Sequence, residues 1–338
     1  MIKKKIKLMF EKFLGYTLYR ISPDYQRTIL ISRSRPPYVV SQCGQSFKRY
    51  VSDNYMPEKL SKLKSELDVE SQDCVDLIYE RILNFPEYHL SKGFYVDQKL
   101  LQTKNEIEDF ERFAQEESVI RNNIWFPEPL SECVFFYHHG LKLLDKTLRN
   151  YISEKDFLDV GSWIGDTALI MHQYKPRKVH SFDISSKVLE RYKKVMFKNG
   201  ISGDKFETVL TALGDSHEDV FVDFNDYEYS TSNNTFKSGE NRVSQTTIDA
   251  YVSGNNLNVG VIQADIEGAE LAMILGAKQT ICTQRPVLLI DIYHRPDQFF
   301  ELKPMIESWN LNYKFMIRSF KFKNLAISEV TLIAIPLI

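Results

Sequence analysis

The sequence predicts an α/β protein in which a helical N-terminal extension precedes a doubly wound, mainly parallel sheet. From Lys155 onward, short apolar runs alternate with amphipathic segments, as strands and helices do when a parallel sheet is covered on both faces. Earlier residues place apolar side chains at helical spacing and show no convincing series of strands. We therefore expect a helical cap over residues 1–150 and an α/β domain over residues 151–338.

The extension carries three amphipathic patterns typical of helices. The first two patterns consist of apolar residues mostly three or four positions apart: Leu60, Leu63 and Leu67, then Val75, Leu77, Ile78 and Ile82. The third pattern predicts a helix over residues 97–114, through Leu100, Ile107 and Phe110. Such stripes bury one face of each helix, which is the reason to expect a packed helical unit.

The α/β half is predicted to contain five strands that alternate with helices. The strands cover residues 156–160, 178–183, 207–212, 259–265 and 287–293, and helices should start near Gly165, Ser186, Thr247 and Gly268. Two further apolar runs, 312–319 and 330–335, have no helix between them. They predict an antiparallel pair that closes the sheet. A polar patch over residues 230–241 predicts an exposed loop.

The composition is that of an ordinary globular protein. Its 338 residues, 43% hydrophobic and 26% charged, suffice for one α/β domain plus an extension. A net charge of -2 gives no global attraction to nucleic acid, so a nucleic-acid partner is not expected. No run approaches the length of about 18 apolar residues that a membrane-spanning helix requires. The cysteines are widely separated, which indicates reduced thiols in the cytoplasm and neither a zinc knuckle nor a disulfide framework: Cys43, Cys74, Cys133 and Cys282.

The first residues form a basic, amphipathic segment. Lysines at positions 3, 4, 5, 7 and 12 are interleaved with Ile2, Ile6, Phe10 and Phe13 at helical spacing. Two interpretations stay open: a solvated helix that packs on the domain, or a helix that makes peripheral contact with the inner face of a membrane.

A glycine turn directly after the first strand of the sheet is the clearest ligand-binding signal. Gly161 allows the chain to turn with its backbone close to a ligand, and Gly165 allows a helix to begin close against the sheet. The spacing G-x-x-x-G lacks the third glycine of a dinucleotide fingerprint. Asp159 would repel a pyrophosphate but could hold the ammonium group of a methionine. The turn therefore suits S-adenosylmethionine better than a nicotinamide cofactor.

Polar residues follow the ends of the other parallel strands, where ligands bind in an open α/β sheet. Asp183 comes 24 residues after Asp159, the distance expected for a carboxylate that accepts hydrogen bonds from a ribose. Ala212 and Leu213, after the third strand, could form the floor of an adenine pocket. These residues extend the predicted donor site across three strands.

An acidic turn follows the fourth strand, and a histidine follows the fifth. Asp265 and Glu267 lie at the turn, beside the expected methyl donor, and His294 lies at the same rim. One interpretation is that a carboxylate or His294 accepts the proton of an attacking alcohol. The other is that the crowded acids hold a divalent cation. Glu270 is equally well explained as a favourable charge in the first turn of a helix.

With these motifs in place, the chain resembles FkbM-type S-adenosylmethionine-dependent methyltransferases. The resemblance covers the last two-thirds of the chain and implies a class I, Rossmann-like methyltransferase fold with a seven-stranded sheet. It implies methyl transfer to a hydroxyl oxygen, with Asp265, Glu267 and His294 bordering the acceptor. The implied donor-binding residues are Asp159, Gly161, Ser162, Trp163, Gly165, Asp183, Ile184, Ala212 and Leu213. The matching segments are Asp159 to Gly165, Phe182-Asp183, Ala212-Leu213-Gly214, Thr247-Ile248-Asp249, Asp265 to Glu270, Gly276-Ala277 and Arg285-Pro286.

We therefore expect an O-methyltransferase that acts on a saccharide or related metabolite, with surface-glycan biosynthesis as the expected setting. The alternative is a non-catalytic donor-binding scaffold in a glycan-assembly complex. Gln263 motivates this alternative, because the family commonly has a lysine at that position. The sequence indicates neither a metal requirement nor an oligomeric state.

Overall fold

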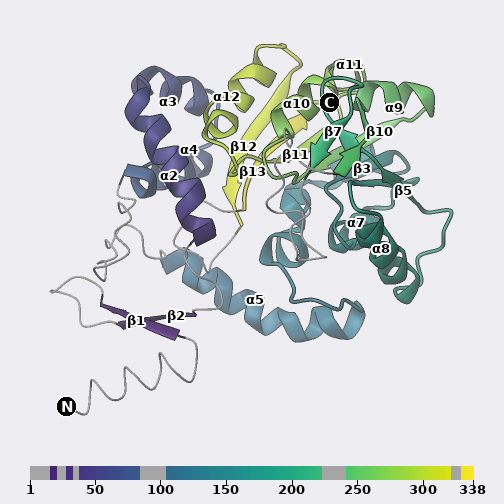
Figure 1. Ribbon diagram of the computed structural model, residues 1–338, viewed down its shortest axis with the longest axis horizontal. Coiled ribbons are helices and arrows are strands. Elements are labelled where there is room, and N and C mark those ends of the chain that lie inside the picture. Colours follow the sequence, from purple (N-terminus) through teal and green to yellow (C-terminus); the bar gives the residue numbers. More distant parts are fainter. Residues whose placement is uncertain (1–15, 21–27, 33–37, 84–103, 223–240, 321–328) are drawn as a thin grey trace.

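The computed structural model describes residues 16–20, 28–32, 38–83, 104–222, 241–320 and 329–338. At its centre lies a seven-stranded sheet with the strand order β12-β13-β11-β10-β3-β4-β5 (Figure 1). Its strands are β3 (Asp156–Val160), β4 (Val179–Asp183), β5 (Phe206–Leu210), β10 (Val259–Ala264), β11 (Val287–Asp291), β12 (Tyr313–Ser319) and β13 (Val330–Pro336). The predicted seven-stranded, doubly wound sheet is confirmed.

The strand order places a topological switch point between β3 and β10. From β3 the chain adds β4 and then β5 on one side, and it later adds β10 and β11 on the other side. These five strands are parallel to one another, whereas β13 runs antiparallel to both β11 and β12. The predicted antiparallel closing pair is therefore present. A ligand is expected beyond the carboxyl ends of β3 and β10, where the strand order reverses.

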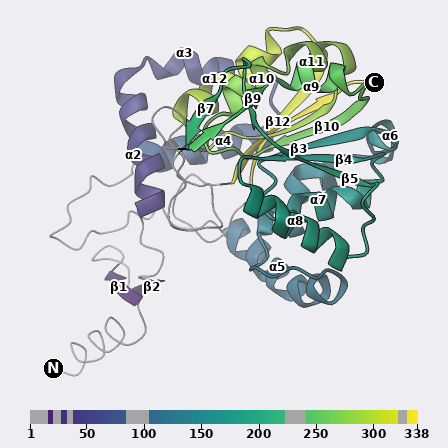
Figure 2. The ribbon, with the colours of Figure 1, turned by 45° about the vertical axis from the view of Figure 1, so that its right-hand side comes forward.

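Helices cover both faces of the sheet. Figure 2 shows α7 and α8 on one side of the sheet and α9 to α12 on the other. Leu158 and Ile262 pack in the core that contains the second group, whereas Phe157 and Val261 pack in the core with α7 and α8, as the two-residue period of a strand requires. The helices are α7 (Asp166–Met171), α8 (Ser186–Lys198), α9 (Ile248–Gly254), α10 (Glu270–Leu275), α11 (Lys278–Gln284) and α12 (Pro296–Glu307).

The N-terminal half packs against the sheet at two separate places. Helices α2 (Tyr38–Asp53), α3 (Met56–Lys64) and α4 (Val69–Leu83) lie beside α12 and the edge strand β12. Helix α5 (Lys104–Asn123) lies on the side of α7 and α8. The helix predicted over 97–114 therefore extends further, to Asn123, and its first seven residues lie outside the described part.

The first half of the chain also contains two strands that the sequence pattern does not predict. Strands β1 (Tyr16–Arg20) and β2 (Thr28–Ser32) form an antiparallel pair there. The basic segment before residue 16 lies outside the described residues, as does nearly all of the polar loop 230–241. Among the helices that the structure describes, none has both the length and the apolar character needed to cross a membrane.

Short elements complete the architecture. Strand β6 (Ala212–Leu213) pairs with β9 (Gln245–Thr246), and β7 (Val220–Val222) pairs with β8 (Asn241–Val243). A π-helical turn η2 (Glu132–Phe136), the 3-10 segment η3 (His138–Leu143) and α6 (Lys146–Ile152) lead into β3, and η4 (His172–Tyr174) follows α7. Helix α6 begins at Asp145, whose carboxylate accepts a hydrogen bond from the Leu148 amide and so caps the helix.

The edge strand β12 is protected by side chains from α4. The Ser71 hydroxyl accepts a hydrogen bond from the Ile317 amide at 3.0 Å, which satisfies a backbone donor that would otherwise face outward. The Arg318 guanidinium contacts both carboxylate oxygens of Asp68, at 3.1 and 2.9 Å. The helical half therefore covers an edge of the sheet that could otherwise pair with another strand.

Candidate active site

The glycine turn holds the carboxyl end of β3 against both of its neighbouring strands. The amides of Gly161 and Ser162 both donate to the Phe182 carbonyl of β4, each at 3.0 Å. Gly161 has a φ of +83°, and a Cβ atom at this position would lie 2.0 Å from the carbonyl oxygen of Asp265. Only glycine fits this conformation and this spacing. The turn thereby positions the strand ends that surround the switch point.

An open cleft lies at this switch point and encloses about 470 Å³ of empty space, open solvent included. It is bordered by the ends of β3, β4 and β10 and by the short strand β6. Its lining contains the predicted residues Gly161, Asp183, Ile184, Ala212, Leu213, Asp265 and Glu267, together with Val160, Phe182, Thr211, Ile266 and Ala269. The structure therefore brings the predicted ribose, adenine and acceptor residues to one cavity.

Asp183 forms one wall of the cleft. Its side chain is almost fully buried, and its carboxylate accepts a hydrogen bond from the Ser185 amide at 2.9 Å. Burial raises the pKa of Asp183 to about 6, while hydrogen bonds from the backbone of Ser185, Ile184 and Trp163 act in the opposite direction. A carboxylate in this position is ionised at neutral pH and is fixed in orientation, as acceptance of two ribose hydroxyls requires.

Asp159 lies beneath the glycine turn and is not among the residues that line the cleft. It is fully buried and accepts a hydrogen bond from the Ser181 hydroxyl at 3.0 Å. Its Oδ1 atom has no hydrogen-bond partner among the described residues. Burial, together with the nearby Asp166 and Asp183 carboxylates, raises the pKa of Asp159 to about 8, although the Ser181 hydrogen bond acts to lower it. Direct contact with a donor's ammonium group would require this side chain to reach past the turn.

Three other predicted donor residues also lie outside the cleft lining. Ser162 is fully buried, and the Trp163 ring packs edge-on against Phe126 at a centroid distance of 5.9 Å. Gly165 precedes α7 with a φ of +91°, and a Cβ there would lie 2.7 Å from a methyl group of Met196 in α8. The close approach at Gly165 is therefore to α8, not to the sheet.

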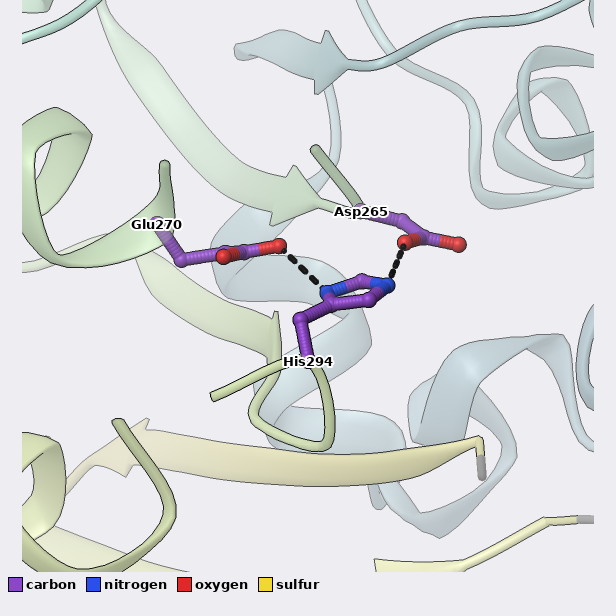
Figure 3. A group of neighbouring side chains, drawn as sticks. All are labelled: Asp265, Glu270 and His294. Carbon is purple, nitrogen blue, oxygen red and sulfur yellow. Dashed lines mark hydrogen bonds and ion pairs between the residues drawn. The ribbon is translucent and has the colours of Figure 1, made fainter. Parts of the chain in front are cut away.

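The opposite wall of the cleft consists of the acidic turn, with His294 behind it. Nε2 of His294 lies 3.3 Å from Oδ1 of Asp265 and 3.5 Å from Oε2 of Glu267. The imidazole is 6% exposed, whereas the two carboxylate side chains are about one-third exposed. Figure 3 shows the imidazole lying between Asp265 and Glu270, with its two nitrogen atoms directed to different carboxylates.

Glu270 is the buried anchor of this arrangement. Its Oε1 accepts from the Ile266 amide and from Nδ1 of His294, and its Oε2 accepts from the Gly268 amide and the Gln298 side chain, over 2.7–3.0 Å. Burial acts to raise the pKa of Glu270, but His294 and the amide donors outweigh this effect and lower the pKa. An ionised carboxylate only accepts hydrogen bonds, so Nδ1 of His294 carries a proton.

The sequence leaves two explanations open for Glu270, a functional carboxylate of the acidic turn or a favourable charge at the helix start. Its contact with His294 depends on a residue 24 positions later, and its contact with Gln298 on a residue 28 positions later. A carboxylate within the first turn of a helix is an ordinary feature of any sequence. No local pattern distinguishes a carboxylate that orients a histidine from one that only stabilises its own helix.

The electrostatics of the acidic turn are those of crowded, partly buried charges. Burial raises the pKa of Asp265 to about 8, and it also raises the pKa of Glu267, whereas His294 lowers both. Burial lowers the pKa of His294, but the three carboxylates around it outweigh this effect and raise it well above its usual range. The turn therefore favours a positive charge near Nε2 of His294.

Gln263 lies in β10 directly beside Asp159, because these two residues are partners in the parallel register of β3 and β10. The side chain is 1% exposed, and its Oε1 has no hydrogen-bond partner within the described part of the chain. A lysine at this position would place its ammonium group near the Asp159 carboxylate. The glutamine leaves that buried acid without a neutralising charge from β10.

Comparison with known proteins gives one family and a set of distant structures. Residues 159–317 match the model of the methyltransferase FkbM domain. No curated protein matches the chain. A methyltransferase FkbM from Methylobacillus flagellatus is 16% identical with a TM-score of 0.45, over 70% of this chain and 56% of that one. An rRNA methylase from Streptococcus thermophilus is 12% identical with a TM-score of 0.39, over 62% of this chain and 100% of that one.

We base the assignment on the family match, because structural similarity at these levels carries no information about activity. The matched stretch contains the glycine turn, the Asp183 wall, the acidic turn and His294. The resemblance predicted from the sequence is therefore confirmed, because residues 159–317 of this chain match the methyltransferase FkbM domain.

Proposed function

We propose that this protein is an S-adenosylmethionine-dependent O-methyltransferase that transfers a methyl group to a hydroxyl of a saccharide or a related metabolite. The observation that carries the proposal is the single cleft at the switch point. Asp183 forms one of its walls, and Asp265 and Glu267 form the opposite wall. A carboxylate that can bind a nucleoside and a carboxylate that can accept a proton thus border the same cleft, as methyl transfer from a nucleoside donor requires.

In this proposal the donor occupies the cleft along the strand ends. Asp183 accepts hydrogen bonds from the ribose hydroxyls, and the apolar side chains of Ala212 and Leu213 contact the adenine. The backbone at Gly161 passes close to the sulfonium end. The methyl group then points toward the acidic turn, where Asp265 and Glu267 are open to the cleft.

The acceptor hydroxyl attacks the methyl carbon along the line of the carbon–sulfur bond. A new oxygen–carbon bond forms, the electron pair of the carbon–sulfur bond stays on sulfur, and the hydroxyl proton passes to a carboxylate of the acidic turn, for which Asp265 is the candidate. Burial raises the pKa of Asp265 to about 8, close enough to neutral pH for a general base. His294 does not accept this proton, because its ring faces carboxylates on both sides; it positions Asp265 and Glu267. Alignment of the reactants supplies most of the acceleration.

The two carboxylates of the acidic turn, Asp265 and Glu267, support the proposal of a saccharide acceptor. Two partly exposed carboxylates can accept hydrogen bonds from neighbouring hydroxyl groups of a sugar, and they disfavour an anionic acceptor. The acceptor would be a neutral glycan intermediate that the enzyme meets in the cytoplasm.

The test is calorimetric titration of the full-length protein with S-adenosylmethionine and S-adenosylhomocysteine. We expect saturable binding that Asp183→Asn weakens by about tenfold or more, because a charge-assisted, bidentate contact is lost. Asp204→Asn, which removes an exposed carboxylate far from the cleft, is the matched control and should bind like the wild type. Asp265→Asn should retain donor binding and lose methyl transfer to the glycan fraction.

A folded protein that binds neither compound would contradict the proposal. Binding without methyl transfer to any glycan fraction would instead favour a donor-binding scaffold. The buried Gln263 beside Asp159 is the observation that keeps this second candidate in view.

A further inference from the structure

Two buried polar atoms face each other behind the acceptor wall without a hydrogen bond. They are Nε2 of His294 and Oδ1 of Asp265, which lie 3.3 Å apart, and neither has a hydrogen-bond partner among the described residues. Oε2 of Glu267 lies 3.5 Å from the same nitrogen. Buried polar groups in folded proteins are nearly always satisfied, so this set requires an explanation.

We infer that Asp265, Glu267 and His294 bind a divalent transition-metal ion. Two ligand atoms that each lie about 2.1 Å from one ion, at angles of about 90–110°, are separated by about 3.0–3.4 Å. The separation of 3.3 Å between Nε2 of His294 and Oδ1 of Asp265 lies within this range, and the separation of 3.5 Å between Nε2 and Oε2 of Glu267 lies just above it. One imidazole with two carboxylates suits ions such as Mn²⁺, Fe²⁺ or Co²⁺, whereas Mg²⁺ and Ca²⁺ prefer oxygen ligands alone.

Glu270 orients the histidine and is not itself a ligand. Four donors already occupy its two oxygens, from Ile266, Gly268, His294 and Gln298. Because Nδ1 of His294 donates to Glu270, the lone pair of a neutral imidazole resides on Nε2, which faces Asp265 (Figure 3). A carboxylate that fixes the far nitrogen of a metal-binding histidine is the usual companion of such a ligand.

The backbone of the acidic turn supports the same site. Glu267 has a φ of +56°, a left-handed backbone conformation that residues other than glycine seldom adopt, and Gly268 follows with a φ of +109°. This conformation is unfavourable for a residue other than glycine, and such strain concentrates at ligand-binding sites. The carboxylate of Glu267 lies 3.5 Å from Nε2 of His294, where it can serve as the third ligand.

The position of the ion relative to the cleft indicates what it is for, and this step rests on the proposed function. Asp265 and Glu267 line the cleft opposite Asp183, so an ion between them and His294 would face the acceptor. Open coordination positions there would bind one or two hydroxyl oxygens of a saccharide and lower their pKa. The inferred acceptor is therefore a molecule with hydroxyl groups on adjacent carbons.

The experiment uses the full-length protein after removal of metal by a chelator, and the probe is Mn²⁺ alone. Electron paramagnetic resonance counts free Mn²⁺ during a titration, and circular dichroism confirms that each variant is folded. We expect one Mn²⁺ per chain, with affinity reduced about tenfold or more in both Asp265→Asn and Glu267→Gln. Asp183→Asn, which removes a carboxylate from the other wall of the same cleft, should bind Mn²⁺ like the wild type.

A folded wild-type protein without saturable Mn²⁺ binding would overturn the inference, as would unchanged binding in both the Asp265 and Glu267 variants. A parallel titration with S-adenosylhomocysteine separates this result from the proposed function. Mn²⁺ binding without nucleoside binding would retain the metal site and refute the methyl-transfer proposal. Nucleoside binding without Mn²⁺ binding would refute the metal site and retain the methyl-transfer proposal. Nε2 of His294 would then carry a proton that it shares with the Asp265 and Glu267 carboxylates.

Discussion

At Gly161 the space between β3 and the backbone of β10 admits a hydrogen atom and no more. A Cβ would lie 2.0 Å from the Asp265 carbonyl oxygen and 2.9 Å from the Ile266 side chain. Asp265 and Ile266 also line the cleft. The single glycine therefore fixes the distance between the two strand ends on which both the donor wall and the acceptor wall depend.

Gly161→Ala should destabilise the protein by more than about 3 kcal/mol, because backbone strain is added to a collision with a carbonyl group that cannot rotate away. Gly200→Ala is the matched control. Gly200 has a φ of +72°, but a Cβ there meets nothing within 4 Å, so only the strain of about 1 kcal/mol remains. Urea unfolding measures both values. Equal losses in the two variants would show that the close approach of β3 and β10 is not required.

The residues of the site differ in how far the sequence could identify them. Gly161 and Asp183 lie within a local pattern of strand, turn and acid, and both line the cleft as that pattern predicts. Asp159 belongs to the same pattern but is buried beneath the turn, since its place in β3 directs its side chain toward α7 and α8. Glu270 could not be recognised, because its role exists only through His294 and Gln298.

At the scale of elements, the contact between α4 and β12 joins the helical half to the sheet. Arg318 is buried, and Asp68 is its bidentate partner. Although burial acts to raise it, hydrogen bonds from Arg318 and Ser71 lower the pKa of Asp68 to about 2. The folded pKa is below that of the unfolded chain, so this stabilisation is present above about pH 4 and is lost as the pH falls toward 2.

Asp68→Asn should cost about 2–3 kcal/mol at neutral pH, because it leaves the Arg318 charge buried without its principal partner. Glu70→Gln tests the same guanidinium from its exposed side. Glu70 contacts Arg318 at 2.8 Å, but its side chain is 76% exposed, so its removal should change stability by no more than about 0.5 kcal/mol. Thermal unfolding at neutral pH distinguishes the two variants. Equal shifts would indicate that β12 is not held by a buried ion pair.

Element prediction succeeded where one chain segment carries a complete signal. Strand β3 has the predicted bounds, and α8 begins at the predicted Ser186 after its Ser185 cap, because period and capping residues are local. Helix α5 continues beyond the predicted end to Asn123 through a polar stretch in which the apolar stripe fades. The pair of β1 and β2 is not predicted because it lies outside the repeated pattern of strand and helix, and each of its strands gains its hydrogen bonds from the other alone.

At the scale of the whole molecule, the helical half and the sheet share a hydrophobic core. Phe47, Leu63 and Ile78 from α2 to α4 pack in the same cluster as Leu288 of β11 and Phe299 of α12. The predicted boundary at residue 150 reflects a change of pattern along the sequence. A pattern of this kind records where elements change type, but it contains no information about which elements share a core.

A shared core predicts that the two halves unfold together. Leu63→Ala removes a fully buried side chain from α3, far from the strands in sequence, and should cost about 3 kcal/mol. Because α3 packs on α12, and α12 packs on the sheet, hydrogen exchange should accelerate by a similar factor in α3, β11 and β13. Leu83→Ala, at a half-exposed position in α4, is the control and should change exchange little. If exchange accelerated in α2 to α4 alone, these helices would be a separate folding unit, and the boundary between cap and α/β domain would be physical and not only a change of pattern.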